Sequence, residues 1–114
     1  MIVYYKNKKL KLKLKKLSPI GMFRGLMFKK YEKNILLFEF KKECRGAIHS
    51  LFVFFPFLAV WLDEKNKVVD LKLIKPFALL QYSKKFCKKL IEIPINDKNK
   101  KIIMFFVGSK HLNI

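Results

Sequence analysis

Arginine, acidic residues and threonine are scarce in this chain of 114 residues. Of 26 basic residues only Arg24 and Arg45 are arginine, which leaves 24 lysines, and threonine is absent. Proteins built to grip phosphates favour the bidentate guanidinium fork, whereas lysine is a compact, hydrated point charge. With only eight acids the net charge is +18. This excess fits an anionic partner, an A/T-biased coding sequence or a thermophile, although thermophile chains usually gain glutamate as well.

Cysteine is also rare. The chain has only Cys44 and Cys87, which stand 43 positions apart. Neither belongs to a CxxC motif, and no histidine has a matching spacing. The spacing therefore excludes a local zinc cluster and a CxxC redox motif. We expect two free thiols, and we predict no metal and no cofactor.

Long apolar runs are missing. The longest, Leu51–Leu62, is interrupted by Pro56 and falls short of the roughly 20 residues that a spanning helix needs. Lysines interrupt the apolar residues of the first segment, which is therefore unlike a signal peptide. We expect a cytoplasmic protein. A hydrophobic fraction of 52% predicts a folded chain, and its length predicts a single domain over residues 1–114.

Leucine and lysine alternate near the N-terminus, which is the period of a half-buried strand. Leucines 10, 12 and 14 fall on one side, and the other side carries Lys9, Lys11, Lys13 and Lys15. The stretch Ile20–Tyr31 has apolar residues at helical spacing and predicts one short helix. Ile35–Phe40 predicts a second strand, and Ala47–Leu62 two short strands or one kinked at Pro56.

Two hairpins are predicted further along the chain. The polar cluster Asp63–Lys67 leads into Val68–Ile74, and the turn Asn96–Lys101 joins Leu90–Ile95 to Ile102–Val107. Six or more short strands favour a mainly β fold. We predict a small antiparallel β-sandwich or barrel, jelly-roll-like, with one short helix.

Three stretches resemble a known family when taken in order: RGLMFK at Arg24–Lys29, IHSLFVFFPFLAVWLD at Ile48–Asp63, and KPF at Lys75–Phe77 followed by LIEIP at Leu90–Pro94. Over about residues 18–95 the chain resembles the domain of unknown function 192 family, small conserved proteins of bacteria and archaea. The resemblance implies a compact all-β, jelly-roll-like fold and no particular reaction.

The chain departs from that family at two positions. Archaeal-type members read Phe-Met-Arg-Phe-Pro-Ile-Asp where this chain reads FVFFPFL, so Phe54 stands at the arginine and Leu58 at the aspartate. Joint replacement of an ion pair by apolar residues is often tolerated. If the family's function uses that pair, the resemblance implies that this chain has lost it.

His49 and Asp63 are weak catalytic candidates, each with a simpler structural interpretation. His49 has no partner histidine or cysteine at a sensible spacing, and Asp63 begins a turn, where a carboxylate commonly accepts backbone amides. Glu39, between two phenylalanines, is expected to face solvent or a lysine. We expect no catalysis.

Anion-binding candidates are Arg24 and Lys29, which flank GLMF, and the four alternating lysines Lys9, Lys11, Lys13 and Lys15. Aromatic residues gather around Pro56 and are expected to form core rather than stack bases. They are Phe52, Phe54, Phe55, Phe57 and Trp61.

Three hypotheses for function follow. The first is a noncatalytic binding or interaction module of unknown ligand. The second is a binder of nucleic acid or another polyanion, whose lysine face meets phosphates without reading bases. The third is an enzyme that uses His49 and Asp63 in a shallow pocket.

Overall fold

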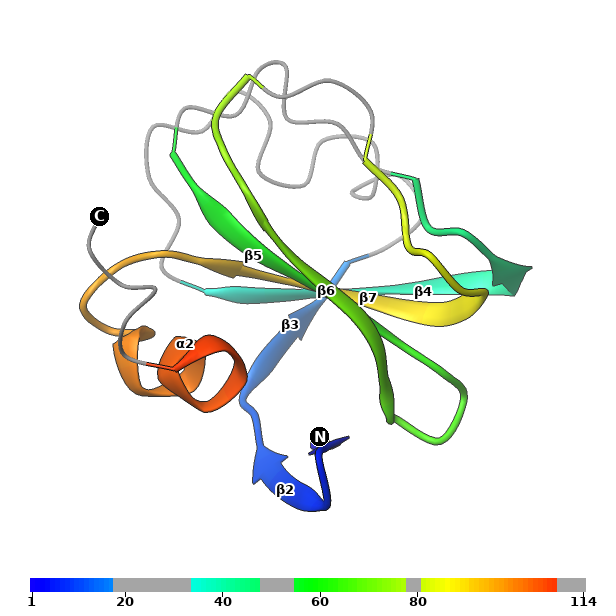
Figure 1. The fold of residues 1–114 in the computed structure, drawn as a ribbon, viewed down its shortest axis with the longest axis horizontal. Coiled ribbons are helices and arrows are strands. Elements are labelled where there is room, and N and C mark those ends of the chain that lie inside the picture. The colour runs from blue at the N-terminus through cyan, green and yellow to red at the C-terminus, as the bar shows by residue number, and fades with distance from the viewer. Residues whose placement is uncertain (18–33, 48–54, 78–80, 109–114) are drawn as a thin grey trace.

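The computed structural model describes residues 1–17, 34–47, 55–77 and 81–108 (Figure 1). These residues form strands and one helix: β1 (Ile2–Tyr5), β2 (Lys8–Lys11), β3 (Leu14–Lys16), β4 (Ile35–Cys44), β5 (Phe57–Leu62), β6 (Val68–Ile74), β7 (Cys87–Pro94) and α2 (Lys100–Val107). The predicted fold class, mainly β with one short helix, is confirmed. The strands make two sheets and do not close into a barrel.

The larger sheet has five strands in the order β3-β4-β7-β5-β6. All its neighbours are antiparallel except β3 and β4, which run parallel. Every residue of β5 is buried, because this strand lies inside the sheet and both of its faces are covered by core. Alternate residues of β5 therefore serve two cores: Val60 packs with Ile91 on one face, and Trp61 with Leu90 on the other.

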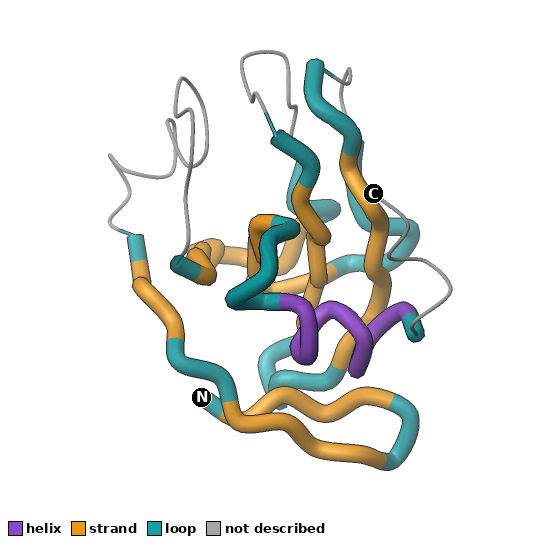
Figure 2. The backbone as a smooth tube through the Cα atoms, turned by 90° about the vertical axis from the view of Figure 1, so that its left-hand side faces the viewer, coloured by secondary structure: helices purple, strands orange, loops and turns teal. Residues whose placement is uncertain are grey.

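The first core lies between the five-stranded sheet and a layer made of α2 and the β1–β2 hairpin. Val3 and Leu12 enter it from the N-terminal segment, and Ile103 and Phe106 enter it from the helix. Figures 1 and 2 show the helix and the hairpin on the same side of the sheet. Tyr5 of the hairpin contacts Phe106, with ring centroids 5.8 Å apart, so the two parts of the layer pack on each other.

The second core is built around Trp61, which is fully buried. Its indole Nε1 donates a hydrogen bond of 2.9 Å to the carbonyl oxygen of Gly46. Gly46 has a φ of +57°, and a Cβ added there would lie 2.6 Å from that indole nitrogen. Both facts require glycine at this position, because a side chain strains a left-handed backbone and the indole is held by its hydrogen bond.

The alternating N-terminal segment is two strands rather than the single strand that its period predicts. Leu12 is buried and the lysines are exposed, so the predicted inner and outer sides are confirmed. β2 pairs with β1 through a turn at Lys6 and Asn7, both with positive φ, as in the tight turns that join hairpins. β3 pairs instead with β4. The chain changes partner between Lys11 and Leu14, which sequence period alone does not reveal.

The predicted C-terminal hairpin is wrong, because Ile102–Val107 lies in helix α2. β7 already has β4 on one edge and β5 on the other, so no edge is left for a following strand. The helix buries Ile103 and Phe106, which are three residues apart and share one face. The buried side chain of Asn99 donates to the carbonyl oxygen of Pro94 at 2.9 Å, which fixes the start of the helix beside β7.

The predicted β5–β6 hairpin and the strand beginning at Ile35 are confirmed. β5 starts directly after Pro56. Leu73 of β6, which is an edge strand of the sheet, is 43% exposed. The predicted helix Ile20–Tyr31 lies outside the described residues. Within the described part of the chain, no helix is long and apolar enough to cross a membrane.

Candidate polyanion-binding surface

Several of the candidates from the sequence lie outside the described residues, and Lys9 and Lys11 lie together on β2. Arg24, Lys29 and His49 fall outside them, as do Phe52 and Phe54. Glu39 is exposed on β4 and pairs with Lys16, with 3.6 Å between Nζ and Oε2, as expected for a solvent-facing acid. Of the aromatic residues around Pro56, Phe57 and Trp61 belong to the second core.

Asp63 begins the turn between β5 and β6. Its Oδ1 accepts backbone N–H groups of Lys65 at 2.8 Å and Lys67 at 2.9 Å. These bonds are the turn-forming contacts that the sequence predicts for this carboxylate. Among the described residues, no group of three His, Cys, Asp or Glu side chains is arranged to hold a metal ion.

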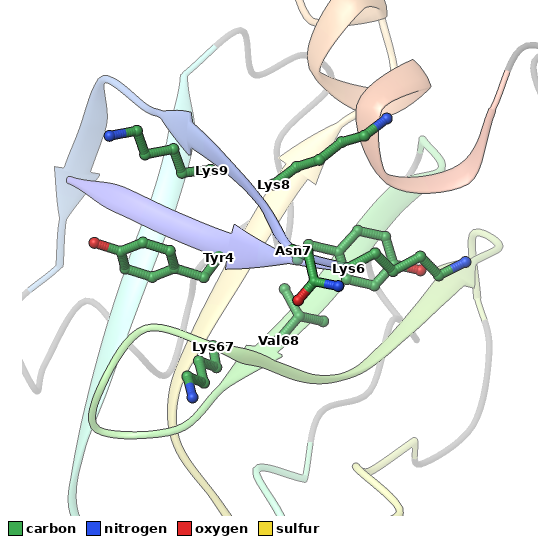
Figure 3. Close-up of a pocket in the computed structure, with 8 residues that line it drawn as sticks. Tyr4, Lys6, Asn7, Lys8, Lys9, Lys67 and Val68 are labelled. Carbon is green, nitrogen blue, oxygen red and sulfur yellow. The ribbon is translucent and has the colours of Figure 1, made fainter.

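The N-terminal hairpin borders a hollow of about 570 Å³ (Figure 3). Its lining combines lysine, tyrosine and one asparagine and contains no carboxylate: Tyr4, Tyr5, Lys6, Asn7, Lys8, Lys9, Lys67 and Val68. Residues 1–17 carry seven lysines and no acid. The positive potential of this end of the molecule is therefore not offset by acids of the same segment.

Tyr4 lies between two lysines of different segments. Lys9 is its direct partner across the hairpin, and Lys67 is its bridge partner on the other side. The backbone N–H of Tyr4 donates to the carbonyl of Asn66 at 2.9 Å, which holds β1 against the β5–β6 turn. In Figure 3 the side chains of Tyr4 and Lys9 extend in the same direction, and Lys67 lies below them on the neighbouring segment. Tyr4 is 43% exposed.

We call Tyr4, Lys9, Lys11 and Lys67 the hairpin surface. Lys9 and Lys11 alternate with Leu10 on β2, and both are exposed. Among the described residues, the side chains of these three lysines have no hydrogen-bond partner and no carboxylate at ion-pair distance. Within the described part of the chain, nothing occupies these ammonium groups, which can therefore meet an external anion.

The hairpin is supported from beneath. Tyr5, on the opposite face from Tyr4, packs on Phe105 and Phe106 of α2 with centroid distances of 6.4 Å and 5.8 Å. Lys89 of β7 donates from Nζ to Oδ1 of Asn66 at 2.6 Å, which anchors the neighbouring turn to the sheet. The hairpin surface therefore rests on packed elements, although it is built from short strands.

Sequence reasoning identified Lys9 and Lys11 but missed Tyr4 and Lys67. Tyr4 precedes the alternating segment, and its place opposite Lys9 depends on the turn at Lys6 and Asn7. A local signal was present in Asn7, because asparagine tolerates the positive φ that a tight hairpin turn requires. Lys67 comes from a distant segment and had no local signal.

Glu92 was also missed. It lies on β7 between Leu36 of β4 and Ala59 of β5, in the second core, and is 6% exposed. Its Oε1 accepts no hydrogen bond from a described residue. Desolvation by burial raises the pKa of Glu92 from 4.5 to about 8, so the carboxyl is largely protonated at neutral pH. The signal was a lone acid inside an apolar strand.

No protein-family model matches the chain. Over 75 residues the chain is 36% identical to a UPF0127 protein of Thermococcus kodakarensis, a match that covers 64% of this chain and 47% of that protein. The chain is similar to an uncharacterised conserved family. It spans about half the length of the UPF0127 relative, and the similarity covers most but not all of its own length.

Two solved structures share the fold at low sequence identity. A protein of unknown function from Novosphingobium aromaticivorans has a TM-score of 0.71 and 9% identity, covering 90% of this chain and 76% of that one. A protein of Sinorhizobium meliloti, described as a candidate transcription regulator, has a TM-score of 0.70 and 12% identity, covering 89% and 81%. At identities this low, the two structures show only that the fold is shared. The similarity to the UPF0127 protein does not indicate a ligand.

Proposed function

We infer that the chain is a noncatalytic module that binds single-stranded nucleic acid through the hairpin surface. The observation that carries this inference is the exposed ring of Tyr4 between Lys9 and Lys67, whose ammonium groups have no partner among the described residues. Aromatic rings beside lysines are the usual means of holding single strands, because every base can stack and every nucleotide carries a phosphate.

The proposal belongs to the first two hypotheses from the sequence and gives the module a ligand class. It also assigns the chain, as one domain, to the domain of unknown function 192 family, which the UPF0127 similarity supports at a coarser level. The described residues support no catalytic site around Asp63, since both bonds to its Oδ1 hold the turn. A phosphate backbone needs only point charges, which suits a lysine-rich and arginine-poor chain.

Lysines of the hairpin surface account for three phosphate contacts. For a single strand, each contact lowers the slope of log affinity against log salt by about 0.7, so the expected slope is about −2. Binding should then weaken about 20-fold between 50 and 200 mM salt. The measurement is fluorescence anisotropy with a labelled twelve-nucleotide DNA and the matching RNA.

A matched pair of variants separates this surface from the general charge of +18. Lys9→Gln/Lys67→Gln removes two charges from the hairpin surface, and Lys84→Gln/Lys85→Gln removes two exposed charges from the segment that precedes β7. We expect the first variant to lose most of the salt slope and the second to keep it. Equal losses in the two variants would mean that binding follows net charge, and the proposed surface would be wrong.

A further inference from the structure

The two cysteines, 43 positions apart in sequence, lie opposite each other in the sheet. The register of β4 and β7 shifts after Glu39 and resumes with Cys44 paired to Cys87. Directly opposed residues of antiparallel strands have Cα atoms about 4.5 to 5.5 Å apart, which overlaps the range of about 4.4 to 6.8 Å found in disulfides. Both thiols are free, and their side chains are in hydrogen-bonding contact.

The two thiols differ in access. Cys44 is half-buried at the end of β4, whereas Cys87 is 1% exposed and belongs to the second core. Burial, followed by the neighbouring Cys44, raises the pKa of the Cys87 thiol to about 12. An oxidant from solvent therefore reaches Cys44 first, and Cys87 is positioned as the resolving thiol.

We propose that Cys44 and Cys87 form an oxidation site at which a hydroperoxide converts the facing thiols into an intrachain disulfide. The Cys44 thiolate attacks one peroxide oxygen, the O–O bond breaks, and the leaving oxygen takes a proton. Cys87 then attacks Sγ of the Cys44 sulfenic acid, so that the S–S bond forms, the S–O bond breaks and water leaves with the Cys87 proton. Two thiols supply two electrons, and one hydroperoxide is reduced.

This bond would join the end of β4 to the start of β7 beside Gly46. A Cβ placed on Gly46 would lie 2.9 Å from Sγ of Cys87, and the carbonyl of Gly46 holds the Trp61 indole. The disulfide would therefore fix the rim of the second core. It is independent of the hairpin surface, which lies on the other side of the sheet.

The test treats the native chain with a twofold excess of hydrogen peroxide at neutral pH and follows intact mass. We expect a loss of about 2 Da, with no dimer, and a tryptic product that joins residues 43–45 to residues 86–88. In urea a smaller share of the oxidised chains should carry the intrachain disulfide, and a larger share should gain about 16 or 32 Da, because unfolding removes the proximity of the thiols. A gain of about 16 or 32 Da in place of the loss of about 2 Da in the folded chain, or the same share of disulfide in urea, would overturn the proposal.

Two single variants assign the roles. Cys87→Ser should leave Cys44 able to form a sulfenic acid, which dimedone traps, but unable to form the intrachain bond. Cys44→Ser should react with peroxide at least about tenfold more slowly, because only the buried thiol remains. Circular dichroism confirms that each variant is folded. If Cys44→Ser reacts as fast as the native chain, the assignment of Cys44 as the first thiol is wrong.

Discussion

The two sides of the five-stranded sheet use polar side chains in opposite ways. On the side of the first core, Tyr4 is 43% exposed and stands beside two lysines whose side chains have no partner among the described residues. On the side of the second core, Tyr82 is 45% exposed and also has two cations near its ring. Composition alone would not separate these two sites.

The cations at Tyr82 are held by the protein itself. The guanidinium carbon of Arg45 lies 4.9 Å from the ring centroid, and Nε donates to the carbonyl of Ser83. Nζ of Lys72 lies 5.8 Å from the same centroid and donates to the Tyr82 carbonyl at 2.8 Å. These contacts stabilise the rim of the second core. A similar set of residues is thus structural on one side and available for a ligand on the other.

The two sides of the sheet differ most in the burial of Glu92, which lies on the side of the second core. Replacing this side chain should have the largest effect on stability. The pKa of Glu92 rises from 4.5 in the unfolded chain to about 8 in the fold. Between pH 4.5 and about 8 the folded chain keeps the carboxyl proton of Glu92, whereas the unfolded chain has released it. The free energy of unfolding therefore falls as pH rises from about 4.5 to about 8. We expect Glu92→Gln to gain about 3 to 5 kcal/mol over the native chain at pH 9, and little at pH 4.

Urea unfolding at pH 4, 7 and 9 measures that effect. Glu64→Gln, which changes an exposed acid in the β5–β6 turn, is the matched control and should alter the free energy of unfolding by less than about 0.5 kcal/mol. A native chain whose stability does not fall above pH 4.5 would show that Glu92 ionises freely. The contrast between a dry second core and a solvated hairpin surface would then fail.

Much of this fold is predictable from sequence, because the spacing of hydrophobic residues along the chain indicates which side chains are buried. The lysine and leucine alternation places Leu12 inside and Lys11 outside, and Asp63 marks the β5–β6 turn. The period fails where pairing is decided by distant segments. Ile102–Val107 is predicted as a strand of a hairpin, and the occupied edges of β7 exclude that pairing.

The residues of the candidate site also fall into two groups: those that the local sequence predicts and those that only the fold brings together. Lys9 and Lys11 follow from the local pattern, whereas Lys67 reaches Tyr4 through a bridge between segments more than sixty positions apart. Cys44 and Cys87 show the same limit, because their spacing indicates no motif while the strand register makes them direct neighbours. Sequence reasoning finds the residue types, and tertiary register decides which of them meet.

Tyr4 and Tyr82 should differ in their effect on the binding of nucleic acid. Loss of one stacked base costs about 1 to 3 kcal/mol of binding, so Tyr4→Ala should weaken the binding of a single strand about 5- to 150-fold. Tyr4→Phe keeps the ring and should bind within about twofold of the native chain. Tyr82→Ala should bind a single strand as the native chain does. Anisotropy titrations at 50 mM salt measure all three, and equal losses at Tyr4 and Tyr82 would contradict the comparison.

The smallest expected effect is on the free energy of unfolding. Here a change beside Tyr82 should matter more than a change on the hairpin surface. Arg45→Gln removes both the hydrogen bond to Ser83 and the contact with the Tyr82 ring, and should lower the free energy of unfolding by about 1 kcal/mol. Lys9→Gln removes a charge with no described partner and should change it by less than about 0.5 kcal/mol. Urea unfolding at neutral pH decides between them. If Lys9→Gln destabilises the chain as much as Arg45→Gln, the hairpin lysines have structural partners and are not free for phosphate.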